Sequence, residues 1–297
     1  MVALPATAGA STVRVEPFRE PPSSAPGCSK YMLCPADMLV FSAAPGEANN
    51  ISITYDDQVA PRRFLVRDQT PTPLTPMEAG PGCERVEEQA VACTAEVLGP
   101  VDLGDLGDRI TTLPLNYGGH IVSGGAGDDV LDVRGQGGAS GGEGDDVVTA
   151  EGGRGGAGDD VLRVLSGEGG AGDDLLRCLR GAFCALNGGP GNDRLTGGRA
   201  DDQLSGQAGR DLLQGRGAKD TLVGGLGNDR LFGGGAADVL RGGPGVDLLA
   251  ARELRALGER AARDDVNCGA GRRDRAVADR RDRVTRCERV TRRRRAR

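Results

Sequence analysis

The chain has 297 residues, of which 50 are glycine and only eight are aromatic, with no tryptophan. So few aromatic side chains argue against an ordinary globular core, and abundant glycine favours disorder unless the glycines recur where a special backbone conformation is needed. The net charge of −6 combines an acidic body with a basic C-terminal region, because residues 251–297 carry 17 arginines and eight acidic residues.

The first eleven residues, MVALPATAGAS, resemble the last part of a signal peptide, because Ala6, Ala8 and Ala10 have the A-x-A spacing of a cleavage site. The charged segment that opens such a peptide is missing. Either the true start lies upstream or this is an ordinary alanine-rich terminus, and we favour the first. No segment approaches the roughly 18–20 apolar residues that span a membrane, so we expect no membrane span.

Residues 12–123 contain three short apolar runs, at residues 39–41, 51–55 and 64–66, separated by proline and glycine turns. Such runs predict β-strands. The sequences GEANNISI at 46–53 and LGDLGDRI at 103–110 look like worn copies of a repeat that occupies residues 124–250. We therefore expect a β-rich N-terminal region that forms the first rungs of a solenoid, with a separate small β-domain as the alternative.

Eight cysteines accompany a single histidine, and no C-x-x-C pair is present. Zinc-site spacing is therefore absent, and cysteines close in sequence are the favoured disulfide partners because they close short loops. Disulfides form in oxidising compartments, so we expect an extracellular or cell-surface protein, with free thiols in the cytosol as the alternative. The expected pairs are Cys28 with Cys34, Cys83 with Cys93, Cys178 with Cys184, and Cys268 with Cys287.

Residues 124–250 contain the repeat itself. The block Gly-Gly-x-Gly-Asp-Asp-x-apolar begins at residues 124, 141, 155 and 169, and seven uninterrupted nonapeptides run from residue 188. All eleven blocks have Asp at the sixth position and an aliphatic residue at the eighth. Glycines allow positive φ, so the first six residues predict a tight turn and the next three a short strand with the eighth side chain inward. Burial of each aliphatic side chain stabilises the fold by roughly 1.5–3 kcal/mol, so the stacked aliphatic residues take the place of an aromatic core.

The fourth position of the nonapeptides alternates strictly. It is Gly in the blocks that begin at 188, 206, 224 and 242, and Ala in the blocks at 197, 215 and 233. Alternation indicates a roll with two unequal sides. The earlier blocks recur at spacings of 17, 14 and 14 residues, so there we expect the second side to shrink to a short turn such as residues 166–168.

The sixth-position carboxylates then lie on one face, where they can hold an oxygen-loving cation together with backbone carbonyls. Stacked carboxylates about 5 Å apart repel by roughly 3 kcal/mol per pair at an effective dielectric near 20, so we expect metal binding to be coupled to folding. On the Ala side, Asp202, Asp220 and Asp238 are expected to be weaker ligands, and Arg210 and Lys219 at the fifth position to lower affinity locally. The expected principal ligands are Asp129, Asp146, Asp160, Asp174, Asp193, Asp211, Asp229 and Asp247.

The block GGxGxDxUx is the repeat of the hemolysin-type (RTX) calcium-binding family, which this chain resembles over residues 124–250. The resemblance implies an all-β fold, a parallel β-roll or β-helix solenoid whose blocks stack on their second neighbours. It also implies several Ca²⁺ ions between stacked turns, bound by the sixth-position Asp side chains and by glycine carbonyls; a metal-free solenoid is the alternative. The implied glycines are Gly125, Gly127, Gly142, Gly144, Gly156, Gly158, Gly170, Gly172, Gly189, Gly191, Gly225 and Gly227.

The flanks resemble actinobacterial exported proteins with the same repeat. GPGCERV at residues 80–86 is similar to their N-terminal regions, which we interpret as further rungs pinned by disulfides. Residues 251–263 predict a short helix that caps the roll, because an open end exposes strand edges. Residues 264–290 resemble the Cys-Gly-x-Gly and Cys-Glu ending of these proteins, closed by Cys268 and Cys287, so that residues 251–297 form a basic capping tail.

Catalysis is not expected. No nucleophile motif accompanies His120, no P-loop lysine follows the glycines at 135–142, and eleven equivalent Asp copies indicate metal ligation rather than a glycosidase pair. The arginine-rich terminus at 292–297 lacks aromatic stacking residues, so we expect a solvated tail and no nucleic-acid partner. The sequence predicts an exported calcium-binding protein with a structural or adhesive role, in which a cell-surface or matrix polymer is the candidate partner. A carrier module of a cytolysin or hydrolase is the alternative, but little room remains for a catalytic region.

Overall fold

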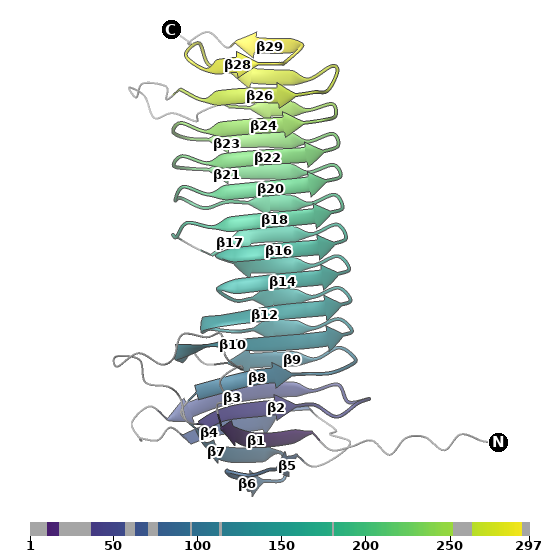
Figure 1. Cartoon of the computed structure of the whole chain (residues 1–297), viewed down its shortest axis with the longest axis vertical. Helices are drawn as coiled ribbons and strands as arrows, with labels where there is room; N and C mark the ends of the chain where they lie inside the picture. The colour runs from purple at the N-terminus through teal and green to yellow at the C-terminus, as the bar shows by residue number, and fades with distance from the viewer. Residues whose placement is uncertain are drawn as a thin grey trace, which may run out of the picture. The chain divides into compact units, whose positions relative to one another are not determined.

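Every regular element in the described part of this computed structural model is a β-strand, which confirms the all-β class (Figure 1). The chain divides into two compact units, Met1–Gly142 and Glu143–Arg297. The described residues are 11–17, 37–56, 63–70, 77–95, 97–112, 115–179, 181–251 and 263–292. None of them forms a helix with the length and apolar character needed to span a membrane.

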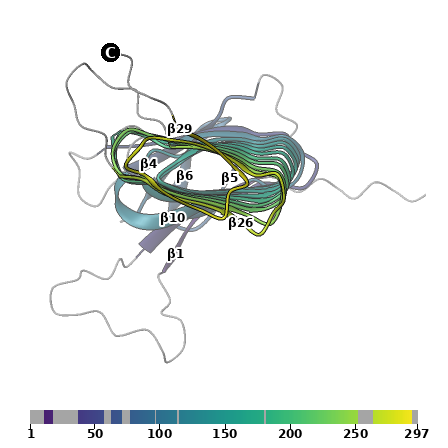
Figure 2. The same ribbon diagram turned by 90° about the horizontal axis from the view of Figure 1, so that it is seen from above.

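Unit 2 is a parallel roll of two sheets, and successive strands along the chain alternate between the sheets. Sheet 1 contains, in order, β28 (Arg283–Thr285), β26 (Asp265–Gly269), β24 (Val239–Gly243), β22 (Thr221–Leu226), β20 (Gln203–Ala208), β18 (Ala185–Pro190), β16 (Ser166–Ala171) and β14 (Gly152–Ala157). Sheet 2 contains β29 (Arg289–Arg292), β27 (Arg275–Ala278), β25 (Leu248–Ala250), β23 (Arg230–Gly234), β21 (Leu212–Arg216), β19 (Arg194–Thr196), β17 (Leu175–Cys178), β15 (Val161–Val164) and β13 (Val147–Thr149). Each strand pairs in parallel with its second neighbour in the chain, so the expected parallel β-roll is confirmed (Figure 2).

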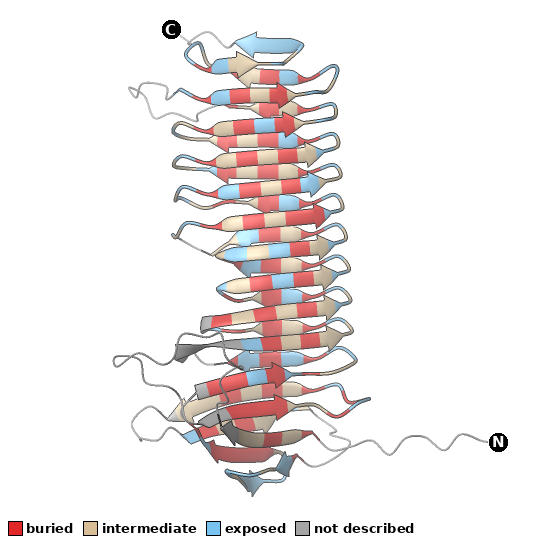
Figure 3. Ribbon diagram, in the orientation of Figure 1, coloured by how far each residue is buried: buried red, intermediate tan, exposed pale blue. Residues whose placement is uncertain are grey.

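The core of unit 2 consists of the eighth-position aliphatic residues. They stack in register within each sheet, as Leu195 does on Leu213 in sheet 2 and Leu204 on Leu222 in sheet 1. The roll therefore has two aliphatic columns, one from each sheet, which appear as buried bands in Figure 3. The fully buried members are Val148, Leu162, Leu176, Leu195, Leu213, Leu231 and Leu249 in sheet 2, and Leu204, Leu222 and Leu240 in sheet 1.

The 14-residue rungs are narrower. Their return connection passes through Leu165, whose N–H donates to the carbonyl of Glu151 at 2.9 Å. The short turn expected at residues 166–168 is therefore misplaced, because Ser166–Ala171 forms strand β16. Glycines replace leucines on sheet 1 here, and a Cβ at Gly153 would lie 2.6 Å from Cγ1 of Val164. The shorter rung leaves no room for a second large side chain.

The tail adds rungs to the roll. Strands β26 to β29 continue both sheets, with Val266 paired to Leu240 and Ala276 paired to Leu249. The expected helix at 251–263 falls mostly outside the described residues, since 252–262 are not described, and the next element is strand β26 rather than a helical cap. The sequence Asp-x-aliphatic persists in this tail, and Gly269 and Gly271 stack on Gly243 and Gly245 in its first leading turn, while its later turns lack glycine. Cys268 and Cys287 form the expected disulfide.

Unit 1 combines parallel rungs with antiparallel strands. Its sheet 1 contains, in order, β12 (Gly135–Glu143), β10 (Leu115–Ala126), β8 (Val97–Asp102), β2 (Asp37–Ser42), β1 (Thr12–Pro17) and β5 (Glu78–Ala79). Its sheet 2 contains β11 (Val130–Asp132), β9 (Arg109–Thr112), β3 (Asn50–Asp56), β4 (Arg63–Asp68), β7 (Ala90–Thr94) and β6 (Cys83–Glu87). The three strands expected at 39–41, 51–55 and 64–66 are present as β2, β3 and β4.

The worn repeats at 46–53 and 103–110 do form rungs, because β3 pairs in parallel with β9 and β2 with β8. Residues 80–86 differ from the expectation, since β6 pairs antiparallel with β7. Only two residues separate these strands, and such a connection closes a hairpin, whereas parallel pairing needs a longer crossover. The Cys83–Cys93 disulfide joins the two strands as expected. Residues 1–10 and the pair Cys28 and Cys34 lie outside the described residues.

Candidate metal-binding columns

Two kinds of turn connect the sheets. A leading turn runs from a strand of sheet 1 to the next strand of sheet 2, and a return turn runs back. In unit 2 the sixth-position Asp of each well-formed block ends a leading turn, and these residues form the first column. The backbone N–H of Asp193 donates to Oδ1 of Asp211 at 2.9 Å, and that of Asp211 to Oδ1 of Asp229 at 2.9 Å. The first column comprises Asp146, Asp160, Asp174, Asp193, Asp211, Asp229, Asp247, Asp274 and Glu288.

The return turns form a second column with the same bonding. The N–H of Asp202 donates to Oδ1 of Asp220, and that of Asp220 to Oδ1 of Asp238, both at 2.9 Å. Asp264 and Asp282 extend this column. The structure thus separates the sixth-position residues of unit 2 into the two sets expected from the Gly and Ala alternation.

Unit 1 has its own short first column. The N–H of Asp108 donates to Oδ1 of Asp129 at 2.7 Å, and the N–H of Asn49 donates to Oδ1 of Asp108 at 2.5 Å. Asp108 and Asn49 belong to the worn repeats and were not among the ligands predicted from the sequence. The spacing between Asp108 and Ile110, which is that of the sixth and eighth positions, was the available signal.

Most carboxylates of the columns keep one oxygen without a hydrogen-bond partner. Their side chains are almost completely buried, with at most 2% exposed, while Oδ1 accepts the backbone N–H of the preceding rung. A buried acceptor without a partner is costly, and a cation is the partner that satisfies a charged one. The described residues with such an unpartnered Oδ2 are Asp108, Asp160, Asp174, Asp193, Asp211, Asp220, Asp229, Asp247 and Asp274.

Burial also changes the ionisation of these groups. Desolvation raises the pKa of Asp160, Asp193 and Asp247 to about 7, although the accepted backbone hydrogen bond partly offsets it and neighbouring carboxylates add to it. The pKa of Asp174 and Asp211 rises to about 6 for the same leading reason. Without a metal, the column therefore disfavours its own charged form near neutral pH.

We expect the calcium-free protein to be more stable at about pH 5 than at about pH 8. A carboxyl whose pKa is raised on folding binds its proton more tightly in the folded state, so stability falls as pH rises from the unfolded value of 3.8 towards about 7. Urea unfolding in EDTA at the two pH values measures the change. With saturating calcium the difference should vanish or reverse, because the metal displaces the proton. Equal urea midpoints at the two pH values in EDTA would contradict the raised pKa values of the column carboxyls.

A second, exposed set of bonds was missed by the sequence analysis. At the fifth position, the N–H of Asp173 donates to Oδ1 of Asp159, and the N–H of Asn192 donates to Oδ1 of Asp173, both at 2.7 Å. These bonds run opposite to those of the first column, since each side chain accepts from the turn that comes after it. The frequent Asp or Asn at this position was the available signal. Arg210 interrupts the set. The hydrogen bonds donated by Asn192 are the main cause that lowers the pKa of Asp173, and the positive charge of Arg210 lowers it further.

The two columns differ in the fourth residue of the turn. It has φ of +138° at Gly209 and +131° at Gly227 in leading turns, but +67° at Ala218 and +72° at Ala236 in return turns. The smaller values lie in the left-handed region that an alanine can enter, whereas the larger ones strongly favour glycine. Leading and return turns therefore present their backbone carbonyls differently.

The predicted ligand set fits calcium in chemistry. All twelve glycines expected to supply carbonyls have φ between +109° and +147°, in leading turns that end in the buried carboxylates. Carboxylate and carbonyl oxygens are the hard donors that Ca²⁺ takes, and the unpartnered Oδ2 atoms leave capacity for a cation. The residues present thus fit the metal.

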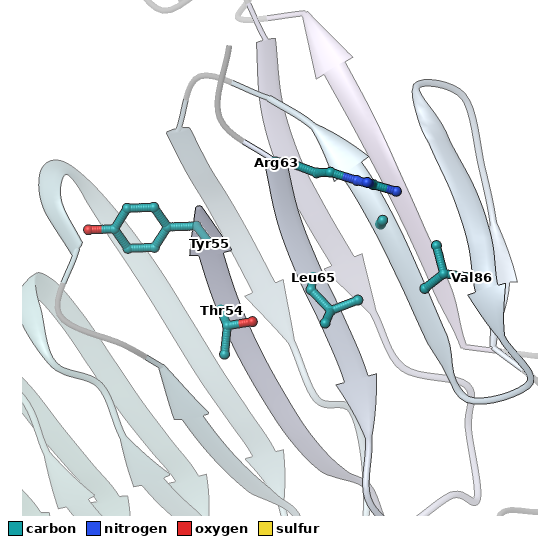
Figure 4. A pocket seen from close by; sticks show the side chains of 6 residues that line it. Thr54, Tyr55, Arg63, Leu65 and Val86 are labelled. Carbon is teal, nitrogen blue, oxygen red and sulfur yellow. The ribbon is translucent and has the colours of Figure 1, made fainter. Parts of the chain in front are cut away.

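A different candidate site lies on sheet 2 of unit 1. A pocket of about 390 Å³ is bordered by Thr54, Tyr55, Arg63, Leu65, Val86 and Ala92 (Figure 4). Arg63 is its charged lining residue, and this side chain is ion-paired with Glu84. The pocket provides no group of converging polar atoms comparable to the columns, which are the stronger candidate.

Comparison with known proteins supports this choice. A family model described as the RTX calcium-binding nonapeptide repeat matches the chain in four copies, at residues 121–136, 139–154, 186–213 and 214–249. The matched segments contain Asp129, Asp146 and every sixth-position Asp from Asp193 to Asp247, while Asp160 and Asp174 of the narrow rungs lie outside them. A search of curated proteins found no match for the chain.

Proposed function

Because this chain contains four copies of the RTX calcium-binding nonapeptide repeat, we propose that its first column binds several Ca²⁺ ions and that this binding drives folding of the roll. One observation carries the proposal: a row of buried carboxylates, stacked turn on turn, in which Asp160, Asp174, Asp193, Asp211, Asp229, Asp247 and Asp274 each have an unpartnered Oδ2. Such a row opposes folding when its members are charged and stabilises the fold when cations lie between them.

The residues that would hold the ions are the first-column carboxylates with the glycine carbonyls of the same leading turns. Asp274 joins them, since it is fully buried, accepts the N–H of Asp247 at 2.9 Å and keeps an unpartnered Oδ2. The second column binds calcium more weakly, because its alanine-containing turns place their carbonyls differently. Bound calcium would supply charge neutralisation, and the protein would supply a binding site assembled only in the folded state.

The protein acts, in this proposal, as an exported structural or adhesive module rather than as an enzyme. The described disulfides, which join Cys83 to Cys93, Cys178 to Cys184 and Cys268 to Cys287, support an oxidising and therefore extracytoplasmic location. Calcium is abundant in such a location. A cell-surface or matrix polymer is the partner class for which we would search once the calcium-loaded form is in hand.

The test is a calcium titration of the purified protein from EDTA, monitored by far-UV circular dichroism, with magnesium as the control. We expect a calcium-specific, saturable gain of β-structure with dissociation constants of about 10⁻⁴–10⁻³ M, as in extracellular modules. Equilibrium dialysis should count several bound ions. An unchanged spectrum without bound calcium would replace the proposal with a metal-free solenoid.

A further inference from the structure

The second column begins at a disulfide instead of a carboxylate. Strand pairing places Ala185 opposite Gln203, so Cys184 occupies the position that Asp202 has one rung later. The N–H of Cys184 donates to Oδ1 of Asp202 at 2.9 Å, as the sixth-position residues do in the column. At the other end of the turn, Arg177 pairs with Thr196, so Cys178 occupies the position of Gly197. The cysteine pair thus replaces the first glycine and the sixth Asp of a return turn.

Three donor atoms converge at this point. The two Sγ atoms and a carboxylate oxygen of Asp202 all lie within 4.8 Å of one another. Cys184 and Asp202 are buried, and Oδ2 of Asp202 accepts the N–H of Gly198 at 2.6 Å, which holds the carboxylate beside the sulfurs. Tetrahedral zinc, with bonds of about 2.3 Å to sulfur and about 2.1 Å to oxygen, needs donors about 3.5–3.8 Å apart. Small movements from the present arrangement meet that requirement.

The site is accessible and its turn has room to adjust. A pocket of about 730 Å³ is bordered by Cys178, Gly181, Gly198, Arg199 and Arg216, among others. No atom lies within 4 Å of a Cβ built on Gly181, in the middle of the turn between the cysteines. The two exposed arginines place positive charge beside a donor set that becomes strongly anionic once the thiols ionise, which favours that state.

We propose that reduction of the Cys178–Cys184 disulfide creates a zinc site made of both thiolates and the Asp202 carboxylate. A dithiol reductant breaks the S–S bond, gives two electrons and two protons to the cysteine sulfurs, and itself becomes a disulfide. One zinc ion then displaces both thiol protons and forms two Zn–S bonds and one Zn–O bond, with water in the fourth position. Soft thiolates select zinc over calcium, so this site does not compete with the first column for its ion.

The experiment uses the full chain in saturating calcium, oxidised or reduced with a phosphine that does not chelate zinc. Competition with a chromophoric chelator should show one zinc ion gained per chain on reduction. Cobalt in place of zinc should give the near-ultraviolet absorption of two thiolate ligands. In the reduced wild-type protein, zinc should protect Cys178 and Cys184 from alkylation, as measured by mass spectrometry. This measurement does not depend on the folding of any variant.

Matched variants separate this site from the other reduced cysteines and from the calcium column. The double substitution Cys178→Ser with Cys184→Ser should abolish the gained zinc, whereas Cys268→Ser with Cys287→Ser should retain it. Asp202→Asn should weaken zinc binding about tenfold or more, while Asp220→Asn, one rung further along the same column, should not. Equal zinc binding by oxidised and reduced wild type, or alkylation of both cysteines regardless of zinc, would overturn the proposal.

Discussion

Alanine at Gly209 is expected to destabilise the calcium-loaded roll by about 2–4 kcal/mol. Gly209 has φ of +138°, outside the region open to alanine, and a Cβ there would overlap the carbonyl oxygen of Gly191 in the preceding leading turn. The overlapped atom belongs to the backbone of a stacked turn, so it cannot move without disturbing its neighbours. Equilibrium unfolding in urea at saturating calcium measures the loss.

Gly152→Ala is the matched control. No atom lies within 4 Å of a Cβ at Gly152, and its φ is not in the positive range. We expect its unfolding free energy to change by less than about 1 kcal/mol. Similar losses for the two variants would mean that the stacking of leading turns does not select glycine at the fourth position.

Asparagine at Asp229 is expected to change stability in opposite directions with and without calcium. Asparagine keeps the Oδ1 that accepts the N–H of Asp211 at 2.9 Å, but it removes a buried charge. In EDTA the variant should be more stable than the wild type, because burial raises the pKa of Asp229 and so opposes its ionisation. In calcium it should bind fewer ions and require about tenfold more calcium to fold, since a charged ligand is lost.

Asp220→Asn provides the comparison from the second column. Asp220 is equally buried and also has an unpartnered Oδ2, so the two variants remove similar carboxylates. The turn of Asp220 contains Ala218 at φ +67°, and we expect a smaller loss of bound calcium, counted by equilibrium dialysis. A loss as large as that of Asp229→Asn would show that both columns bind calcium equally.

The repeat alone was sufficient to predict the roll and the grouping of its carboxylates. Asp at the sixth position and Leu at the eighth determine which side chains lie in the turn and which lie in the core, because strand side chains alternate. The alternation between Gly227 and Ala218 then separated leading from return turns, and the backbone φ values give its physical reason.

Local pattern was less informative where few glycines of the repeat remain. The rungs of β26 to β29 form on Asp274 and Ala276 at the required spacing, yet the basic composition of this tail suggested a cap. The narrow rungs close at Leu165 because glycine on the opposite sheet lets the two sheets approach, a tertiary effect that repeat spacing does not reveal. Which carboxylate oxygen remains unpartnered depends on the stacking of whole turns, so it required the structure.

The hydrogen bonds of the first column make the two ends of the roll chemically different. Each backbone N–H of a first-column Asp in unit 2 finds its acceptor on the next rung towards the C-terminus, as the N–H of Asp247 does on Asp274. Loss of a rung from the C-terminal side leaves a buried backbone N–H of the column without its acceptor, which costs about 1–3 kcal/mol. Loss from the N-terminal side frees a carboxylate oxygen of the column, which water or a cation can satisfy, and it also removes strand acceptors such as the Asp193 carbonyl that accepts the N–H of Leu212. The column therefore has a polarity: its backbone donors face one end of the roll and its free carboxylate oxygens face the other, whereas the paired strands place backbone donors towards both ends.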